Sequence, residues 1–256
     1  MTSTMFKREH RPGNPLLLGN FWNLESAQIL RNAGFKALGS SSAAISSDFG
    51  LNDGEKISFP TALSICTAAM QVFDGPISID FEAGYSSSIG DIERGAHEIY
   101  QSGLSGLNIE DSRKDRTQLR AIVDQAAIIR RIKLVQDSYT TSAVLNARVD
   151  TYLTGENDLV ETVKRARAYI DAGADCIFVP GLVNLEAISR LVQELQFFPV
   201  NIMLLPKCGL SVADLSSVGV ARISFGNFFR EAVISSSVNR AKRFLAGGDS
   251  RALFAQ

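Results

Sequence analysis

Four segments of the chain repeat one pattern, in which a helix-like stretch ends at a glycine and an apolar run follows within a few residues. The segments are NAGFKALGSS, QSGLSGLNIED, DAGADCIFVPG and SSVGVARISFG, with glycines at Gly34, Gly103, Gly173 and Gly219. Glycine adopts the left-handed conformation that ends many helices, and an apolar run of this kind predicts a buried strand. The chain is therefore expected to alternate helices and strands.

This alternation extends over the sequence and predicts eight strands separated by about eight helices. The expected strands are PLLLGNF, KALGSS, GPISIDF, GLNIED, AVLNARVD, DCIFVPG, VNIMLLP and ARISFG, and clear helical patterns are DIERGAHEIYQS and DLVETVKRARAYIDA. Eight such units in 256 residues fit an α/β protein with a (β/α)8 TIM barrel, and a doubly wound open sheet is the alternative. No linker or charge block divides the chain, so residues 1–256 are expected to form one barrel domain with a C-terminal helical segment.

The composition excludes several classes of function. A net charge of -1 gives no basic surface for nucleic acid or for an anionic membrane. The N-terminal MTSTMFKREHRPGNP is polar, and no apolar run reaches the length of a membrane span. Three widely separated cysteines, Cys66, Cys176 and Cys208, do not indicate a disulfide framework. We therefore expect a cytoplasmic protein that binds neither nucleic acid nor membranes.

Polar side chains follow the second to fifth predicted strands, at the C-terminal ends where TIM barrels carry their active sites. They are Ser40 to Ser42, Asp80 and Glu82, Glu110 and Asp111, and Arg148 and Asp150. For any one of these acids, the alternative is that polar residues simply resume where a strand ends.

Asp80 and Glu82, in ISIDFEAGY, are two residues apart, so an extended chain would point both carboxylates to one side. Like charges that close require a cation or a proton between them. Because Mg²⁺ prefers carboxylate and water oxygens, Asp80, Glu82 and Glu110 are candidate ligands, either directly or through water. A zinc site or a Ser-His-Asp triad is not expected, because His10 lies in the N-terminal tail and His97 lies in a predicted helix.

Four motifs carry a family resemblance. DFEAGY, GLNIEDS, LNARVDTYL and AGADCIFVPG, in this order and spacing, resemble the isocitrate lyase and phosphoenolpyruvate mutase superfamily, and within it the phosphoenolpyruvate phosphonomutase-like group. The resemblance implies a modified (β/α)8 barrel that forms a homo-oligomer, a tetramer or a dimer, with C-terminal helices exchanged between subunits. It also implies Mg²⁺ or Mn²⁺ and a small carboxylate substrate, a 2-oxo acid that reacts through an enolate-like species.

The resemblance further implies substrate-binding and catalytic residues. Ser41, Ser42 and Ala43 match the turn that holds the substrate carboxylate and oxo group. Arg148 matches the arginine that grips the substrate carboxylate, and Asp53 matches an acid on the loop after that turn. Arg148 and Asp53 are therefore expected to be catalytic.

The same resemblance implies the metal ligands. Asp80 matches the principal ligand, whereas Glu82 and Glu110 match acids that bind the metal mainly through water. Glu110 is also expected to be catalytic.

The sequence departs from this superfamily in the loop after the fourth strand. Lyases of the superfamily carry KKCGH there, with the cysteine as catalytic acid, whereas this chain has RKDRTQLR with neither cysteine nor histidine. The loop offers Lys114 and Arg116, which are expected to hold a distal substrate carboxylate, and Pro180 stands where the mutases have a histidine. Cys208 follows the seventh strand, where a packing role is the expectation.

These observations predict an Mg²⁺-dependent carbon-carbon lyase that acts on a small 2-oxo or 2-hydroxy dicarboxylate. Oxaloacetate decarboxylation is favoured over C–C cleavage of larger acids, because its leaving group, CO₂, needs no protein acid. The alternatives are a catalytically weak protein that binds 2-oxo acids, and P–C bond chemistry on phosphonopyruvate or phosphoenolpyruvate.

Overall fold

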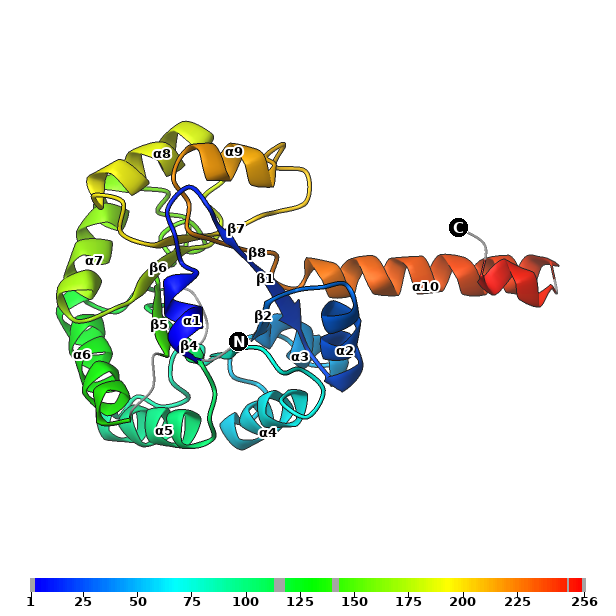
Figure 1. Ribbon diagram of the computed structural model, residues 1–256, viewed down its shortest axis with the longest axis horizontal. Helices are drawn as coiled ribbons and strands as arrows, with labels where there is room; N and C mark the ends of the chain where they lie inside the picture. The colour runs from blue at the N-terminus through cyan, green and yellow to red at the C-terminus, as the bar shows by residue number, and fades with distance from the viewer. Residues whose placement is uncertain (1–2, 113–117, 140–142, 248, 255–256) are drawn as a thin grey trace.

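Eight parallel strands close into a barrel in the computed structural model (Figure 1), which describes residues 3–112, 118–139, 143–247 and 249–254. Each strand pairs with the next along the chain, and β8 closes the barrel by pairing with β1. The strands are β1 Leu16–Phe21, β2 Ala37–Ser40, β3 Ile77–Asp80, β4 Gly106–Glu110, β5 Val144–Arg148, β6 Cys176–Val179, β7 Val200–Met203 and β8 Arg222–Ser224. The predicted (β/α)8 barrel is confirmed, and the open doubly wound sheet is wrong.

Helices follow the strands and form an outer layer around much of the barrel (Figure 1). They are α1 Ser3–Arg8, α2 Leu24–Asn32, α3 Ser42–Asp48, α4 Phe59–Ala69, α5 Ile89–Gln101, α6 Ile122–Ser138, α7 Leu159–Asp171, α8 Leu185–Glu194, α9 Val212–Ser217, α10 Phe228–Gly247 and the 3₁₀ helix η1 Ser250–Leu253. The two sequence segments with the clearest helical pattern correspond to α5 and α7. The glycine after α7, Gly173, has φ = 106°, so its conformation suits glycine as the repeat predicts.

Most of the apolar core lies between the strands and the helices, where outward-facing strand residues meet the buried faces of α2 and α4 to α9. A second, smaller cluster closes the N-terminal end of the barrel interior. There, Phe6 of α1 is completely buried against five inward-facing residues of four strands, namely Leu16, Leu18, Ala37, Val144 and Cys176. In Figure 1, α1 lies across this end of the barrel. Access to the interior is therefore from the C-terminal ends of the strands.

His10 belongs to this closure, so the expectation that it lies in a polar tail was wrong. Its side chain is buried, its Nδ1–H donates to the carbonyl of Phe6 at 2.9 Å, and its ring meets the Phe6 ring edge-on. Burial, with help from the charge of Arg222, lowers the pKa of His10 from 6.5 to about 3. The imidazole is therefore neutral in the folded protein at ordinary pH.

The last long helix, α10, runs away from the barrel (Figure 1) and has no buried residue along its 20 residues. Its first turn contacts the barrel through Phe229, whose ring lies 5.9 Å from that of Trp22. Beyond this turn, apolar side chains such as Leu245 are exposed, and Leu17 on the outer face of β1 is 43% exposed. The expected exchange of this helix between subunits stays a prediction.

The buried neutral His10 makes stability depend on pH. Below its unfolded pKa of 6.5, the unfolded chain binds a proton that the folded chain excludes until about pH 3. As the pH is lowered from 6.5 to about 3, this residue is therefore expected to reduce the free energy of unfolding by up to about 1.4 kcal/mol for each pH unit. In His10→Asn, where an amide N–H replaces the Nδ1–H donor, this contribution should disappear.

Urea unfolding at several pH values between 7.5 and 4.5 measures the difference in slope between the two proteins. The exposed His97 provides the control, and His97→Asn should keep the wild-type slope. If the free energy of unfolding depended on pH in the same way in wild type and His10→Asn, His10 would not be the source of the pH dependence.

Candidate active site

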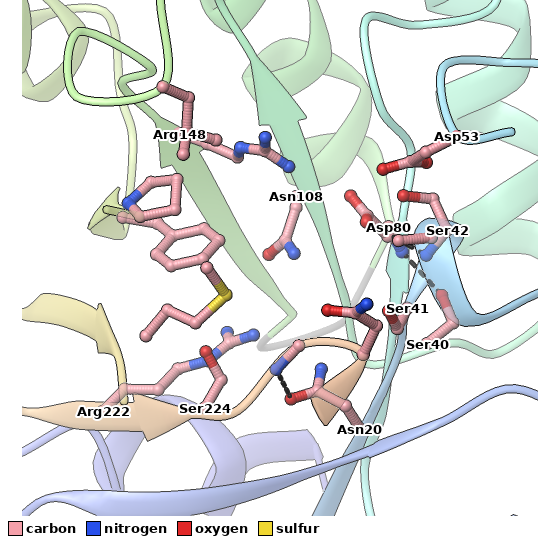
Figure 2. Close-up of a pocket in the computed structure, with 17 residues that line it drawn as sticks. Asn20, Ser40, Ser41, Ser42, Asp53, Asp80, Asn108, Arg148, Arg222 and Ser224 are labelled. Atoms are coloured by element: carbon pink, nitrogen blue, oxygen red, sulfur yellow. Dashed lines mark hydrogen bonds between the residues drawn. The ribbon is translucent and has the colours of Figure 1, made fainter. Parts of the chain in front are cut away.

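A cavity of about 180 Å³ lies at the C-terminal ends of the strands (Figure 2). Seven site residues that the sequence singled out line it, namely Ser40, Ser41, Ser42, Ala43, Asp53, Asp80 and Arg148. They come from the end of β2 and the start of α3, the segment between α3 and α4, and the last residues of β3 and β5. The barrel thus brings these side chains together from segments up to about a hundred residues apart, and their roles stay predictions.

Asp80, the last residue of β3, joins the turn after β2 to the cavity wall. Its backbone N–H donates to Ser40 Oγ at 2.8 Å, and its Oδ2 accepts from the backbone N–H of Ser42 at 3.3 Å. Its Oδ1 is buried and accepts no hydrogen bond from any described residue. A buried carboxylate oxygen without a donor is costly, and a bound cation would satisfy it.

Glu82 does not line the cavity, although the alternation of an extended chain places it beside Asp80. The strand ends at Asp80, and Glu82 sits in a turn with φ = 46°, so the period of two no longer applies. Glu82 is buried, and it accepts from the backbone N–H of Glu55 at 2.7 Å and from the hydroxyl of Tyr85 at 2.9 Å. It therefore connects the turn after β3 to the segment that carries Asp53.

The pKa of Glu82 reflects both its burial and the negative charges around it. Burial, together with the charges of Asp80 and Asp53, raises this pKa from 4.5 to about 7, whereas the hydrogen bonds from the Glu55 N–H and the Tyr85 hydroxyl oppose the change. A cation near Asp80 would relieve the same repulsion.

Arg148, the last residue of β5, is buried and held by two acids. Its Nε donates to Asp150 Oδ1 at 2.6 Å, its Nη2 donates to Asp150 Oδ2 at 3.1 Å, and its Nη1 lies 2.8 Å from Glu110 Oε2. Burial alone would lower the pKa of Arg148, but Asp150, Glu110 and Asp80 raise it well above its usual value. The guanidinium is therefore permanently charged and fixed in orientation, with its Cζ 5.9 Å from the centre of the Phe178 ring.

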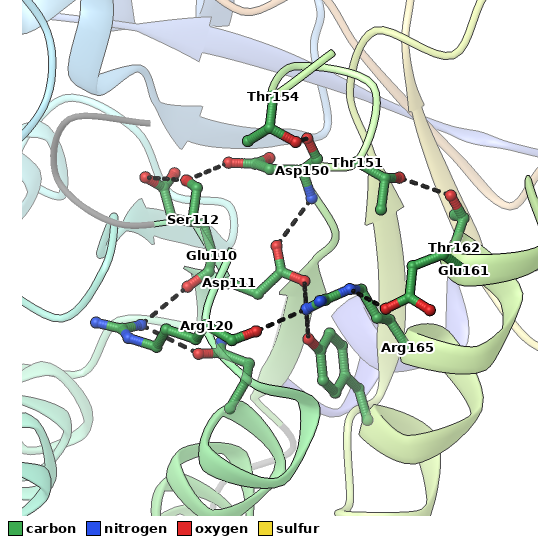
Figure 3. Close-up of polar contacts among 12 residues, drawn as sticks. Glu110, Asp111, Ser112, Arg120, Asp150, Thr151, Thr154, Glu161, Thr162 and Arg165 are labelled. Carbon is green, nitrogen blue, oxygen red and sulfur yellow. Dashed lines mark hydrogen bonds and ion pairs between the residues drawn. The ribbon is translucent and has the colours of Figure 1, made fainter. Parts of the chain in front are cut away.

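A second group of buried polar residues contacts Asp150, the acid that binds Arg148 (Figure 3). Asp111 accepts from the backbone N–H of Asp150 at 2.9 Å and, through Oδ2, from the Tyr169 hydroxyl at 2.7 Å and Arg165 Nη1 at 3.2 Å. Burial and the charge of Asp150 raise the pKa of Asp111 to about 6. The contacts tie the ends of β4 and β5 to α7, so Asp111 holds the acid that orients Arg148.

The three predicted metal acids do not form one ligand set. Asp80 faces the cavity, Glu82 is bound in the turn, and Glu110 contacts Arg148 and accepts from Ser112 Oγ at 3.2 Å. Accordingly, no group of three or more His, Cys, Asp or Glu side chains in the described ranges is arranged to hold a metal ion. The site fits a cation that keeps most of its water and binds few carboxylates directly, as Mg²⁺ and Mn²⁺ do.

The cavity is also lined by five polar residues that the sequence analysis did not select, namely Asn20, Asn108, Arg222, Ser224 and Asn227. Asn108 occupies an inward position of β4 and its Oδ1 accepts from Asn146 Nδ2 at 2.7 Å. Asn20 Oδ1 accepts from the backbone N–H groups of both Phe225 and Gly226 at 2.9 Å, which fixes the turn after β8. The available signal was a polar residue inside an otherwise apolar strand, as in LLLGNF and GLNIE.

Other predicted residues lie elsewhere. Lys114 and Arg116 fall outside the described residues. Cys208 is half-buried in the turn after β7 and does not line the cavity, and none of the three cysteines forms a disulfide. Within the described part of the chain, no helix combines the length and apolar character that a membrane span requires.

Comparisons with known proteins agree with this architecture. An uncharacterized protein of Mycobacterium tuberculosis is 33% identical over 236 residues, which cover 91% of this chain and 86% of that protein. The 2-methylisocitrate lyase of Salmonella typhimurium is 28% identical over 189 residues, covering 72% and 63%. The crystal structure of a phosphonopyruvate hydrolase with oxalate and Mg²⁺ has the same fold, with a TM-score of 0.86, 21% identity, and coverage of 98% of this chain and 89% of that one.

A family model described as phosphoenolpyruvate phosphomutase matches residues 6–245, which is nearly the whole barrel and most of α10. With the resemblance of the four strand-end motifs, this match assigns the fold and the family together. The chain belongs to the phosphoenolpyruvate phosphomutase family, whose superfamily includes lyases and mutases.

Proposed function

We propose that this protein is an Mg²⁺- or Mn²⁺-dependent lyase that acts on a small 2-oxo or 2-hydroxy dicarboxylate, with oxaloacetate decarboxylation as the favoured reaction. One observation carries the proposal. A single small cavity combines a buried aspartate oxygen that lacks a donor among the described residues, the Ser41 to Ala43 turn, and a fixed guanidinium. These are the groups needed to bind a cation, an oxo group and a carboxylate.

The metal would be held directly by Asp80, with its remaining positions filled by water and substrate oxygens. Glu82 and Glu110 would act on it through water and through their charge, because both are engaged by neighbouring protein groups. When bound, such an ion supplies a Lewis acid for the substrate oxo group. The fold neighbour that carries oxalate, a small dicarboxylate, together with Mg²⁺ supports this assignment.

Arg148 binds the carboxylate next to the oxo group. A guanidinium has five N–H donors, and Asp150 and Glu110 occupy three of them. The other two are left for substrate, in an orientation that the two acids fix before binding. The entropy of ordering this side chain is therefore lost during folding rather than during catalysis.

Beyond these binding groups, decarboxylation of oxaloacetate requires few further catalytic groups from the protein. The bond between C3 and C4 breaks, CO₂ leaves, and the electron pair forms the enolate of pyruvate, which takes a proton from water at C3. Asp53, on the segment between α3 and α4, is assigned to orient that water. The described residues that line the cavity include neither cysteine nor histidine, which agrees with a reaction that needs no strong protein acid for the leaving group.

The metal assignment predicts a large effect of one isosteric substitution. Asp80→Asn is expected to weaken oxalate binding in the presence of Mg²⁺ by at least about a hundredfold, because an amide replaces the anionic ligand. Glu82→Gln should weaken it by less than about tenfold, since Glu82 acts through water. Titration calorimetry with oxalate, with and without Mg²⁺, measures both effects.

The exposed Asp74 provides a matched control, and Asp74→Asn should bind oxalate like wild type. If Asp80→Asn retained metal-dependent oxalate binding at the wild-type affinity, Asp80 would not be the principal ligand.

The reaction assignment predicts a substrate preference. Metal-dependent turnover of oxaloacetate is expected to exceed that of isocitrate, methylisocitrate and phosphonopyruvate by at least about tenfold in kcat/KM, or about 1.4 kcal/mol of transition-state discrimination. Parallel assays with Mg²⁺ measure the four rates, and Asp80→Asn serves as the control for decarboxylation by free metal.

Faster cleavage of isocitrate or methylisocitrate would show that another residue supplies the missing acid, and Cys208→Ser would test the first candidate. Tight oxalate binding without turnover, and without exchange of pyruvate methyl protons for deuterium, would instead identify a binding protein.

A further inference from the structure

A second guanidinium reaches the cavity from β8, three strands along the barrel wall from the strand of Arg148. Arg222 is the first residue of β8, is only 1% exposed, and lines the cavity together with Ser224 of the same strand. Figure 2 shows the two arginine side chains on different sides of the cavity, with Asn108 between them and Asp80 to one side. The cavity therefore has two cationic positions in addition to the predicted metal site.

The two arginines differ in how their charges are balanced. Arg148 is held by Glu110 and Asp150, whereas Arg222 forms no ion pair with any described residue. The Nε and Nη1 of Arg222 are buried and have no hydrogen-bond partner within the described ranges. Burial lowers the pKa of Arg222 to about 10, so the group still carries its charge at neutral pH.

Among the groups near Arg222, the carboxylate of Asp80 favours the charged form of the guanidinium but forms no ion pair with it. Cys176 and His10 lie toward the base of the barrel, where burial raises the pKa of the thiol to about 12 and lowers that of the imidazole to about 3, so both are neutral. Asn201 pairs with Arg222 in the sheet register, and its Nδ2 is another buried donor without a described acceptor. Arg222 and Asn201 thus present buried donors without a described acceptor, and an acceptor that carries negative charge would satisfy them.

We propose that Arg222 is a specificity-determining residue that binds the distal carboxylate of the substrate. The inference rests on the proposed function, since Arg148 and the metal site take the 2-oxo acid end and leave Arg222 for the other end. It defines the substrate class as a small dianion with carboxylates at both ends. It also assigns to the barrel wall the role that the sequence analysis gave to Lys114 and Arg116.

Two ligands of nearly the same shape, malate and malamate, separate the effect of the distal negative charge from the effect of the ligand's shape. Malamate has an uncharged amide where malate has its distal carboxylate. With Mg²⁺ present, the wild-type protein is expected to bind malate at least about thirtyfold more tightly than malamate, because hydrogen bonds to charged groups are worth a factor of ten to a hundred. Arg222→Gln should reduce this preference to about twofold. Titration calorimetry measures all four affinities.

Oxalate distinguishes failure of this inference from failure of the proposed function. It has no distal group beyond the 2-oxo acid end, so Arg222→Gln should change its affinity by less than about threefold. A wild-type protein that binds oxalate but does not distinguish malate from malamate would overturn the role of Arg222 and leave the proposed function standing. A protein that does not bind oxalate with Mg²⁺ would overturn both.

Turnover gives an independent readout. The distal carboxylate of oxaloacetate loses its charge as CO₂ forms, so Arg222 stabilises the bound substrate more than the transition state. Arg222→Gln is therefore expected to raise KM for oxaloacetate about ten- to a hundredfold, while kcat stays unchanged or rises. A fall in kcat with unchanged KM would contradict the assignment.

Stability separates a binding role from a structural one. Arg222→Met removes a buried charge that no described residue pairs, so the ligand-free variant should have a Tm at least equal to that of wild type. A Tm lower by more than about 5 °C, with the malate preference intact, would show that the role of Arg222 is structural.

The double variant Lys114→Gln, Arg116→Gln should keep the malate preference. Loss of the preference there, with retention in Arg222→Gln, would overturn the inference.

Discussion

The buried pairing of Arg148 with Glu110 and Asp150 organises the C-terminal end of the barrel. Each partner stands at or just beyond the end of β4 or β5, so the pairing fixes these strand ends relative to one another. Leaving any of these charges unpaired would cost several kcal/mol, which makes the arrangement close to all-or-none. Asp111 extends it to α7 through Arg165 and Tyr169. The guanidinium that faces the cavity is therefore held by the fold itself.

Backbone strain accumulates on the other side of the cavity. Glu55, Glu82 and Tyr85 all have positive φ, at 57°, 46° and 57°, in a region that non-glycine residues rarely adopt. They also bind one another, because Glu82 accepts from the Glu55 N–H and the Tyr85 hydroxyl, and Glu55 accepts from the Tyr85 N–H at 2.6 Å. These mutual hydrogen bonds stabilise three strained residues at once. They fix the position of the segment that brings Asp53 to the cavity.

The polarity of the barrel interior changes along its axis. At the N-terminal end, Phe6 and the strand residues around it exclude water, whereas the layer above contains Asn146, Asn201 and Arg222, which are fully or almost fully buried. A polar layer of this kind is costly unless its groups meet partners. The apolar shell between strands and helices offsets that cost, so the interior can retain unsatisfied donors at the base of the cavity. Glu110 and Asp150 balance the charge of Arg148, whereas Arg222 has no ion-pair partner among the described residues, which is the basis for the proposal that it binds a ligand.

The sequence by itself determined the barrel and the end at which its polar residues gather. Helix-ending glycines such as Gly173 and apolar runs act locally, and parallel strands in a barrel bring their C-terminal ends to one face, so Asp80 and Arg148 could be placed there without coordinates. Only the tertiary structure decided which acids face the cavity, because Glu82 leaves the extended conformation in a turn and Glu110 finds Arg148 on the next strand. It also decided the position of Arg222, since whether a charged strand residue is paired depends on contacts across the barrel, which no local pattern in the sequence encodes.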